Sequence, residues 1–302
     1  MKQLLICLLF PWLSQGQPWV FYNLENLFDT INDRGFHDEE FTPNGTKDYA
    51  SIRYRLCIRQ SARVLNALEQ SGKSAPVIGL CEIENRSVLE DLINHKGMRN
   101  YGPWGIVHYD SPDHRGIDCG IIYKSDQIQI IDSDRIRYSN DSLHTRDALF
   151  VRYAFDTIIY NVVVVHLPSK AGGAIQSEWK RDLAWQKISA AVDTCLDPTI
   201  IMGDFNDEVG RLQTKFFHHQ WRSSNEPKSQ GTYKYGGRWN TIDGAIANFD
   251  ISTSICDLSM LHVKDTKWGG SKPRRRWQGS FFKNGYSDHL PVYFSQVVGM
   301  RK

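Results

Sequence analysis

The sequence predicts an α/β fold in which two packed sheets carry helices on their outer sides. Eight segments read as strands, and residues 158–166 give the strongest signal because they contain four consecutive valines. Only two long segments, residues 48–70 and 176–195, have apolar side chains at helical spacing. A doubly wound parallel sheet would need strands and helices to alternate more regularly, and no glycine-rich turn joins a strand to a helix.

The remaining predicted strands are short runs rich in β-branched, aromatic or aliphatic residues. In chain order they are residues 19–23, 76–82, 118–124, 149–155, 199–202, 242–248 and 290–297. The first helix places Tyr54, Cys57, Ser61, Val64, Leu65 and Leu68 on one face, and the second places Ala184, Ile188, Ala191, Val192 and Cys195 on one face. A pair of glycines precedes the second helix, and Asp197 and Pro198 follow its end.

Length and composition fit one globular domain. The chain has 302 residues, of which 41% are hydrophobic and 23% charged. With 36 Lys and Arg against 34 Asp and Glu, the net charge is only +2. This excludes a surface that is basic throughout and coats nucleic acid by charge alone, but it does not exclude a local basic patch. Neither a repeat nor a linker interrupts the chain, so we expect a single domain from residue 17 to residue 302.

The first 16 residues resemble a signal peptide. Lys2 precedes a short apolar run at residues 4–10, and small residues follow at 14–16. The run is too short to span a bilayer, and the alternative is a buried first strand or helix. We therefore expect an exported protein, periplasmic or extracellular, with no stable membrane anchor.

Five cysteines remain after this leader, and none forms a C-x-x-C pair of the kind that binds zinc. Their odd number and apolar surroundings favour buried thiols over a disulfide framework, with one bridge as the alternative.

Polar residues recur where the predicted strands end or begin, and strand ends can meet at one edge of stacked sheets. They are Asn23, Glu82, His166, Asp204, Asn206, Asp243, Asp288 and His289. Carboxylate and amide oxygens such as those of Glu82 and Asn23 suit Mg²⁺. Asp204 could then orient or deprotonate water with Asn206 holding it, and a histidine could stabilise developing charge if Asp243 or Asp288 kept it protonated. This combination predicts cleavage of a phosphate ester.

Five motifs occur in a familiar order: residues 21–29 (FYNLENLFD), 79–85 (GLCEIEN), 165–169 (VHLPS), 202–207 (MGDFND) and 287–291 (SDHLP). Together they resemble the endonuclease/exonuclease/phosphatase superfamily over nearly the whole chain after the leader. The resemblance implies a four-layered α/β/β/α sandwich of two mainly antiparallel sheets. It also implies one or two Mg²⁺ or Mn²⁺ ions and direct attack of water, without a covalent intermediate.

The resemblance also implies roles for the individual residues. Asn23, Glu82 and Asp288 match metal-side positions, and Asp204 with Asn206 matches the pair that activates water. His289 matches the histidine that faces the phosphate, oriented by Asp243, although Gly244 stands where the family usually has a bulky residue. His166 matches a second histidine of the deoxyribonuclease and sphingomyelinase branches, and this argues against a role in apurinic-site repair.

Several charged residues are candidates for contacts around the substrate. Lys170, Arg115, Arg274 and Arg275 are candidate substrate-binding residues, and the basic run 272–277 could hold a phosphate chain while Trp277 or Trp268 stacks on a base. The alternative is a solvated basic loop. Asp118 is a candidate partner of His166, Arg146 reads as a solvated surface charge, and Glu25 and Glu84 read as surface or supporting acids.

The sequence thus predicts a monomeric, metal-dependent phosphodiesterase with nucleic acid as its substrate, a nuclease of low sequence specificity. Other phosphate esters are the alternative, through a phosphatase or phospholipase-C-like activity on inositol phosphates or sphingomyelin. A third hypothesis, an inactive protein that binds phosphorylated ligands, conflicts with the filled catalytic positions.

Overall fold

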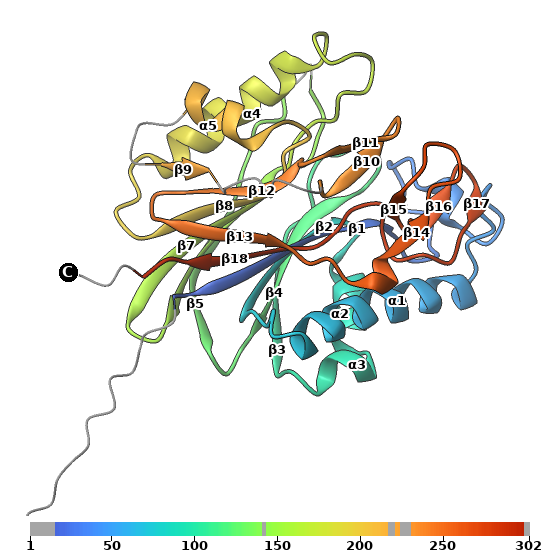
Figure 1. Ribbon diagram of the computed structural model, residues 1–302, viewed down its shortest axis with the longest axis horizontal. Helices are drawn as coiled ribbons and strands as arrows, with labels where there is room; N and C mark the ends of the chain where they lie inside the picture. Colours follow the sequence, from blue (N-terminus) through green and yellow to red (C-terminus); the bar gives the residue numbers. More distant parts are fainter. Residues whose placement is uncertain (1–15, 141–142, 217–220, 224–230, 299–302) are drawn as a thin grey trace, which may run out of the picture.

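The computed structural model describes residues 16–298 except 141–142, 217–220 and 224–230, and Figure 1 shows its layers. Two six-stranded sheets pack against each other. Helices α1 (Ser51–Gln70), α2 (Arg86–Asn94) and α3 (Lys96–Arg99) lie on the outer side of the first sheet, and α4 (Glu178–Val192) and α5 (Val209–Phe216) on the outer side of the second. The predicted four-layered α/β/β/α sandwich is confirmed.

Each sheet contains one parallel strand pair, β1 with β2 and β7 with β8, and is otherwise antiparallel. The first has the order β13 (Ile251–Ile255), β18 (Val292–Gln296), β1 (Pro18–Leu27), β2 (Val77–Ile83), β4 (Asp118–Lys124), β3 (Trp104–His108). The second has the order β5 (Ile128–Ile136), β6 (Ala148–Phe155), β7 (Ile158–His166), β8 (Thr199–Asp204), β12 (Asp243–Ala247), β9 (Arg222–Ser223).

Short elements gather at the end of the sandwich opposite the beginning of β1 and the end of β18 (Figure 1). They are the two-stranded pairs β10 (Tyr233–Tyr235) with β11 (Arg238–Asn240), β14 (His262–Lys264) with β15 (Ser271–Pro273), and β16 (Trp277–Gln278) with β17 (Phe281–Phe282), and the 3-10 turns η1 (Glu39–Phe41) and η2 (Ser259–Leu261). The ends of β7 and β8 point toward these short elements, which therefore form the rim of the candidate site.

The core follows from the two-residue alternation of side chains along a strand. Trp19 and Phe21 of β1 pack between the sheets against Val162 and Val164 of β7. Their neighbours point the other way: Val20 and Tyr22 pack in the α1 layer, and Val163 and Val165 pack in the α4 layer. The four valines therefore fill both faces of β7, which explains why that strand has no polar side.

All eight predicted strands and both long helices are present, with ends shifted by a few residues. The structure adds α2, α3, α5 and several edge or two-residue strands, whose sequences are too short or too polar to show a clear period. One detail of the second helix was wrong: Ala191 is exposed and Cys195 lies beyond the helix end, because Arg181 and Trp185 occupy the buried face instead.

Cys57, Cys81, Cys119 and Cys256 are buried free thiols and Cys195 is a half-buried one, as the sequence favoured. Within the described residues, no helix is both long and apolar enough to cross a membrane. Residues 1–15 of the proposed leader lie outside the described part of the chain, so the signal peptide stays a prediction.

Candidate active site

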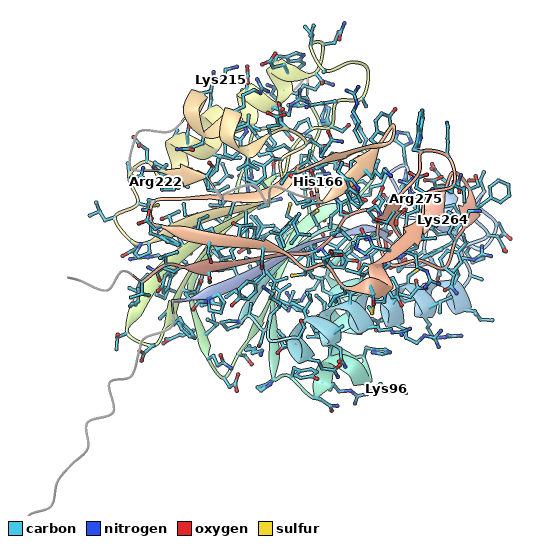
Figure 2. The ribbon with its side chains drawn as sticks, in the orientation of Figure 1. Lys96, His166, Lys215, Arg222, Lys264 and Arg275 are labelled. Carbon is cyan, nitrogen blue, oxygen red and sulfur yellow. The ribbon has the colours of Figure 1, made fainter. Side chains whose placement is uncertain are left out.

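Neighbouring strands of the second sheet bring three of the candidate residues into one row. His166 at the end of β7 pairs in register with Asp204 at the end of β8, and Asp204 pairs with Asp243 at the start of β12. Strands β1 and β2 of the facing sheet contribute Asn23 and Glu82. Figure 2 labels His166 near the middle of the molecule and Arg275 toward the small hairpins.

The amide of Asn23 connects the two sheets. Its Nδ2 donates to Oδ2 of Asp204 at 3.1 Å and to Oε1 of Glu82 at 3.4 Å, while its Oδ1 accepts the backbone N–H of Glu25 at 2.9 Å. In this orientation Asn23 bridges two carboxylates as a hydrogen-bond donor. Binding a cation through its oxygen would require the amide to rotate and lose the bond to Glu25.

His289 is the charged histidine of the site. Its Nδ1 donates to Asp243 at 2.8 Å from Oδ2, and its Nε2 lies 3.8 Å from Oδ2 of Asp204. Burial opposes a charged imidazole, but the negative charges of Asp243 and Asp204 outweigh it and raise the pKa of His289 well above its usual range. His289 is therefore a cation at neutral pH, directed toward Asp204.

Asp204 lies between the two histidines and is almost fully buried. Its Oδ1 accepts the backbone N–H of Asn206 at 2.9 Å, while the Asn206 side chain donates to the carbonyl of Leu167. Asn206 thus holds Asp204 through its backbone rather than its side-chain amide. Burial, and then the negative charge of Asp243, raises the pKa of Asp204 to about 7, which suits a group that accepts a proton near neutral pH.

His166 has a different character. Its Nε2 lies 3.7 Å from Oδ2 of Asp204 and 3.8 Å from Oε1 of Glu82, and its buried Nδ1 has no hydrogen-bond partner. Burial, together with the positive charges of Arg146 and Arg115, lowers the pKa of His166 well below its usual range. Of the two candidate cations, His289 is therefore charged and His166 neutral.

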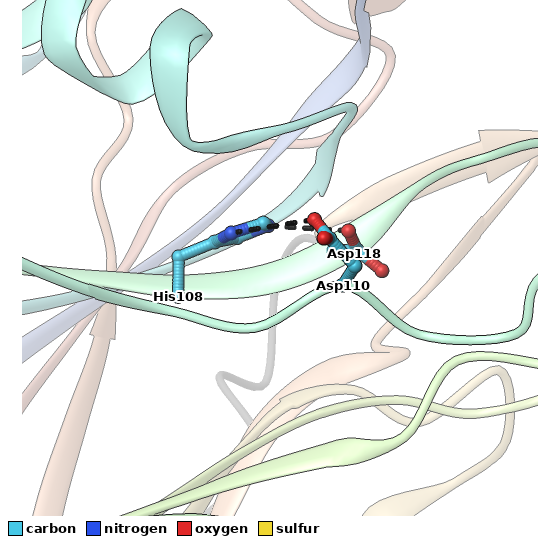
Figure 3. A group of neighbouring side chains, drawn as sticks. All are labelled: His108, Asp110 and Asp118. Atoms are coloured by element: carbon cyan, nitrogen blue, oxygen red, sulfur yellow. Dashed lines mark hydrogen bonds and ion pairs between the residues drawn. The ribbon is translucent and has the colours of Figure 1, made fainter. Parts of the chain in front are cut away.

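The expected bond between Asp118 and His166 is absent, and this expectation was wrong. Figure 3 shows Asp118 with His108 and Asp110 instead. Asp118 receives a hydrogen bond from Nε2 of His108 at 3.1 Å, and its other oxygen accepts the N–H and hydroxyl of Ser111. These three carboxylate and imidazole groups lie close enough together to hold a cation, but the oxygens of Asp118 are already occupied by donors.

The basic run 272–277 divides into exposed and buried residues. Arg275 is half-buried and forms an ion pair with Asp288 at 2.6 Å, and Arg274 is exposed, 5.6 Å from the ring of Tyr286. Arg276 is fully buried and Trp277 is 5% exposed, so the expectation that both are available to a substrate was wrong. The carboxyl group of Glu25 accepts the backbone N–H groups of both residues and so holds this part of the run inside the fold.

The guanidinium of Arg276 holds several parts of the site together. It donates to the carbonyls of Leu24 and Tyr286 at 2.8 and 3.0 Å and to the hydroxyl of Ser61 at 3.0 Å. These bonds join the end of β1, helix α1 and the segment before Asp288. A loop sequence of three arginines gives no sign of which one will be buried.

The other candidate substrate-binding residues lie at the rim with acidic partners. Arg115 pairs with Asp113 at 3.7 Å and Lys170 with Asp207 at 3.1 Å, and each side chain is nearly half exposed. Arg146 is not the expected solvated charge, because it is buried between Asp113 at 2.8 Å and the carbonyl of Leu167.

Glu25 and Glu84 are also more buried than expected, at 4% and 6% exposure. Burial, and then the negative charge of Asp288, raises the pKa of Glu25 to about 8. Burial raises the pKa of Glu84 to about 8 as well. Glu25 supports the site through Arg276 and Trp277, whereas Glu84 points into a separate group of acids.

Comparison with known proteins shows which family has this fold and these motifs. The model of the endonuclease/exonuclease/phosphatase family matches residues 19–297. The chain belongs to this family. Its hydrolases act on phosphate esters and generally use a divalent metal, so a phosphoesterase activity is supported. Among curated proteins no match is found.

Solved structures of this family share the fold at low identity. A humanized TDP2 from D. rerio has a TM-score of 0.60 at 11% identity, covering 94% of this chain and 100% of its own. A mannosyl-6-phosphatase of Bacteroides thetaiotaomicron has a TM-score of 0.56 at 15% identity (93% and 100%). The catalytic domain of human Nocturnin with bound sulfate has a TM-score of 0.56 at 12% identity (94% of each chain). At such identities the similarity shows the fold alone.

The residues present fit the hard divalent cation that the family uses. One carboxylate oxygen of Glu82 accepts the backbone N–H of Asn26 at 2.9 Å, while its Oε1 has only long contacts, 3.4 Å to Nδ2 of Asn23 and 3.8 Å to Nε2 of His166. That oxygen and Oδ2 of Asp204 are both within reach of the Asn23 amide, so two carboxylates face the same space. Oxygen donors of this kind are those that Mg²⁺ and Mn²⁺ prefer.

Strained backbone coincides with this family site. Glu25, Asn26, Glu82 and Asn206 all have positive φ angles, between 47° and 57°. Such angles are uncommon outside glycine and persist where the surrounding structure holds them. At Glu82 the left-handed conformation interrupts the regular pairing of β2 with β4 beside the carboxylate.

Sequence reasoning missed two residues that shape the pocket of His289. The ring of Tyr233 lies 4.8 Å from the imidazole of His289, and the two residues form an isolated β-bridge. The hydroxyl of Ser287 donates to the carbonyl of Asn23 at 2.7 Å and accepts the N–H of His289 at 3.0 Å. Ser287 stands in the recognised SDHLP motif and could have been found there, whereas the segment around Tyr233 carries no motif.

Proposed function

We propose that this protein is a divalent-metal-dependent phosphodiesterase that uses direct attack of water, and that its substrate is nucleic acid, cut with low sequence specificity. The observation that carries the proposal is the convergence of Glu82 and Asn23 from one sheet with Asp204 and His289 from the other. Two carboxylates and one imidazolium face the same point, which is the arrangement that a phosphate and its metal counterion need.

Each residue of the site has its own role in the reaction. Asp204, held by the backbone N–H of Asn206, orients the attacking water and accepts its proton, since its pKa of about 7 lies near neutral pH. His289, kept protonated by Asp243, donates from Nε2 to the phosphate as negative charge develops. The cation bound at Glu82 would polarise the phosphate and stabilise the leaving oxygen.

The neutral His166 suits a different role. At 3.7 Å from Asp204 and 3.8 Å from Glu82, its Nε2 can donate a hydrogen bond to a phosphate oxygen without adding a full charge. Asp288 is held by Arg275, so it contributes to the metal side of the site only together with that arginine.

Nucleic acid is supported by an aromatic and basic rim beside His289. Tyr233 begins the β10–β11 hairpin, and Gly237 in that hairpin packs against Trp268, which is 57% exposed. Lys267 lies 4.9 Å from the ring of Trp268. An exposed tryptophan with an adjacent cation, fixed to the hairpin that contacts the catalytic histidine, suits stacking of a base next to its phosphate.

A second candidate, a phosphatase or phospholipase-C-like activity, is favoured by the burial of Arg276 and Trp277. Without them the basic run offers fewer contacts for a long phosphate chain, so a small phosphate ester would suffice. One structural neighbour is named a mannosyl-6-phosphatase, which adds sugar phosphates to the inositol phosphates and sphingomyelin considered from the sequence.

A substrate panel tests these proposals. We would incubate the purified protein with single- and double-stranded DNA, RNA, inositol phosphates, mannose 6-phosphate and sphingomyelin, each with Mg²⁺, Mn²⁺ or EDTA. Metal-dependent cutting of nucleic acid that Asp204→Asn abolishes is the expected result. Failure to cut any nucleic acid under every metal condition removes the nuclease proposal, and release of phosphate or phosphocholine would establish the second candidate.

The same experiment separates an enzyme from an inactive phospho-ligand binder. An inactive binder would turn over none of these substrates and would still bind its phosphorylated ligand when Asp204 is replaced.

We further propose that the protein is exported and that it is a monomer. Cell fractionation would test the export, and light scattering of the purified chain would test the oligomeric state.

A further inference from the structure

A second group of carboxylates lies next to the candidate active site without being part of it. Asp33 and Asp38 belong to the segment between β1 and η1, and Glu84 directly follows β2. Each residue offers one oxygen, and these oxygens lie within 4.8 Å of one another. Three carboxyl groups so close together repel each other when all are ionised, unless something positive lies between them.

No cationic side chain plays that part. In the described part of the chain, no Lys, Arg or His forms an ion pair within 4.0 Å of these three carboxylates. Asp38 is only 1% exposed, and although its Oδ2 accepts the N–H of Asp33 at 2.8 Å, its buried Oδ1 has no hydrogen-bond partner. A buried carboxylate oxygen without a donor is costly, and an ion or ordered water is the usual explanation.

There is room for such an ion. The three residues line a cavity of about 200 Å³, whose wall also includes Asn85, Asp110 and Asp118. A water molecule occupies about 30 Å³ in the liquid, so the cavity has room for a cation with several of its waters. The oxygen donors, the charge and the volume therefore point to the same kind of ligand.

We propose that Asp33, Asp38 and Glu84 bind a Ca²⁺ ion at a site separate from the active site. All the donors are oxygens, as a hard cation requires. Two of them, from Asp33 and Asp38, belong to a loop, which does not impose a regular geometry on the site. Ca²⁺ accepts six to eight oxygens in flexible geometry, whereas Mg²⁺ demands a near-perfect octahedron and gives up water reluctantly. Waters in the cavity complete the shell.

The site ties a loop to the strand that carries the active-site acid. Glu84 accepts the N–H of Asp29 at 2.5 Å, and Glu82 accepts the N–H of Asn26 at 2.9 Å. Glu82 in β2 and Glu84 just after it thus both hold the chain that leaves β1, but Glu82 faces Asn23 and Glu84 faces Asp33 and Asp38. Ca²⁺ binding would fix residues 29–41 against β2 without using the active-site acid.

Calorimetry on the full chain tests the site. After EDTA treatment and dialysis, we would titrate CaCl₂ into the wild type and into Glu82→Gln, which removes the active-site acid. One Ca²⁺ per chain with similar affinity in both is the expected result. Loss of the binding event in Glu82→Gln would assign the ion to the active site and overturn the proposal, as would the absence of any Ca²⁺ binding.

Substitutions in the group then locate the ion. In the Glu82→Gln background, Asp38→Asn and Asp33→Asn should each weaken Ca²⁺ binding about 10-fold or more. Asp156→Asn, which removes one negative charge from the exposed turn between β6 and β7, should change the affinity less than about twofold. Equal affinity in Asp38→Asn and Asp156→Asn would refute the assignment.

Thermal unfolding guards against a misfolded variant. Ca²⁺ should raise the unfolding midpoint of the wild type and of Asp156→Asn, and should leave that of Asp38→Asn unchanged. Without metal, Asp38→Asn should unfold at or above the wild-type temperature, because it removes an unpaired buried negative charge. A metal-free Asp38→Asn that is less stable than the wild type would show that this carboxylate serves the fold rather than an ion.

Discussion

Asp243 and His289 form a buried ion pair across the candidate site, with Nδ1 of the imidazole 2.8 and 3.0 Å from the two carboxylate oxygens. Asp243 is 1% exposed and His289 6% exposed. Because Nδ1 is held by Asp243, the other ring nitrogen is directed toward Asp204, 3.8 Å away. The pair thus sets both the charge of the imidazole and the direction in which it can donate.

Replacing Asp243 with asparagine should therefore disable the enzyme while keeping its fold. An amide cannot stabilise the charged imidazole as a carboxylate does, and it can favour the wrong tautomer. We expect kcat/KM to fall about 10²-fold or more on whichever substrate the panel identifies. Circular dichroism would check the fold. Asp257→Asn, which disrupts the exposed Asp257–His262 pair, is the matched control and should keep wild-type activity.

Glu82→Gln tests the metal side of the site. Gln can still accept the N–H of Asn26, but it loses the negative charge that attracts the cation. We expect the Mg²⁺ concentration for half-maximal activity of EDTA-treated enzyme to rise about 10- to 100-fold. Glu90→Gln, at an exposed position on α2, should leave that concentration unchanged. An unaltered Mg²⁺ requirement in Glu82→Gln would exclude this carboxylate as a ligand.

The positions of these acids could be predicted because they depend on the backbone alone. A strand that leaves the core exposes its next polar residue at the sheet edge, and the edges of two packed sheets meet. Asp204 and Asp243 are therefore brought into register by the β8–β12 pairing, whatever their distance in the sequence. The motifs around them added the chemistry that the family performs.

The basic run could not be interpreted in this way. Arg274, Arg275 and Arg276 are identical side chains in an irregular loop, so no period distinguishes them. Only Arg276 is buried, because the Glu25 carboxylate and carbonyls from β1 and from residue 286 accept its hydrogen bonds. Those acceptors are supplied by tertiary structure, which a local pattern does not contain.

This difference predicts that two substitutions in the same loop change the free energy of unfolding by very different amounts. Arg276→Met leaves three buried acceptors without their donors, namely the carbonyls of Leu24 and Tyr286 and the hydroxyl of Ser61, so the free energy of unfolding should fall by about 3–5 kcal/mol. Arg274→Met, at an exposed position, should change it by no more than about 0.5 kcal/mol. Urea denaturation of both variants measures the two values. Equal losses would mean that Arg276 does not hold the loops together.

Asp207 provides a prediction for pH. It lies beside the fully buried Arg181 and accepts hydrogen bonds from Lys170 and Arg211. Burial alone would raise the pKa of Asp207, but these cationic donors outweigh it and hold the pKa below its usual value. The folded state thus binds the proton of Asp207 more weakly than the unfolded state, where the pKa is about 3.9.

The sign of the effect follows from this linkage. The stabilisation by ionised Asp207 is complete above about pH 4, and it is lost as the pH falls through the lower pKa of the folded state. Asp207→Asn should therefore destabilise the protein at pH 7 by about 1–3 kcal/mol, and the gap to the wild type should narrow below about pH 4. Urea unfolding at pH 7, 5, 4 and 3 measures this gap. A gap that is constant down to pH 3 would mean that the negative charge of Asp207 is not what stabilises the folded state.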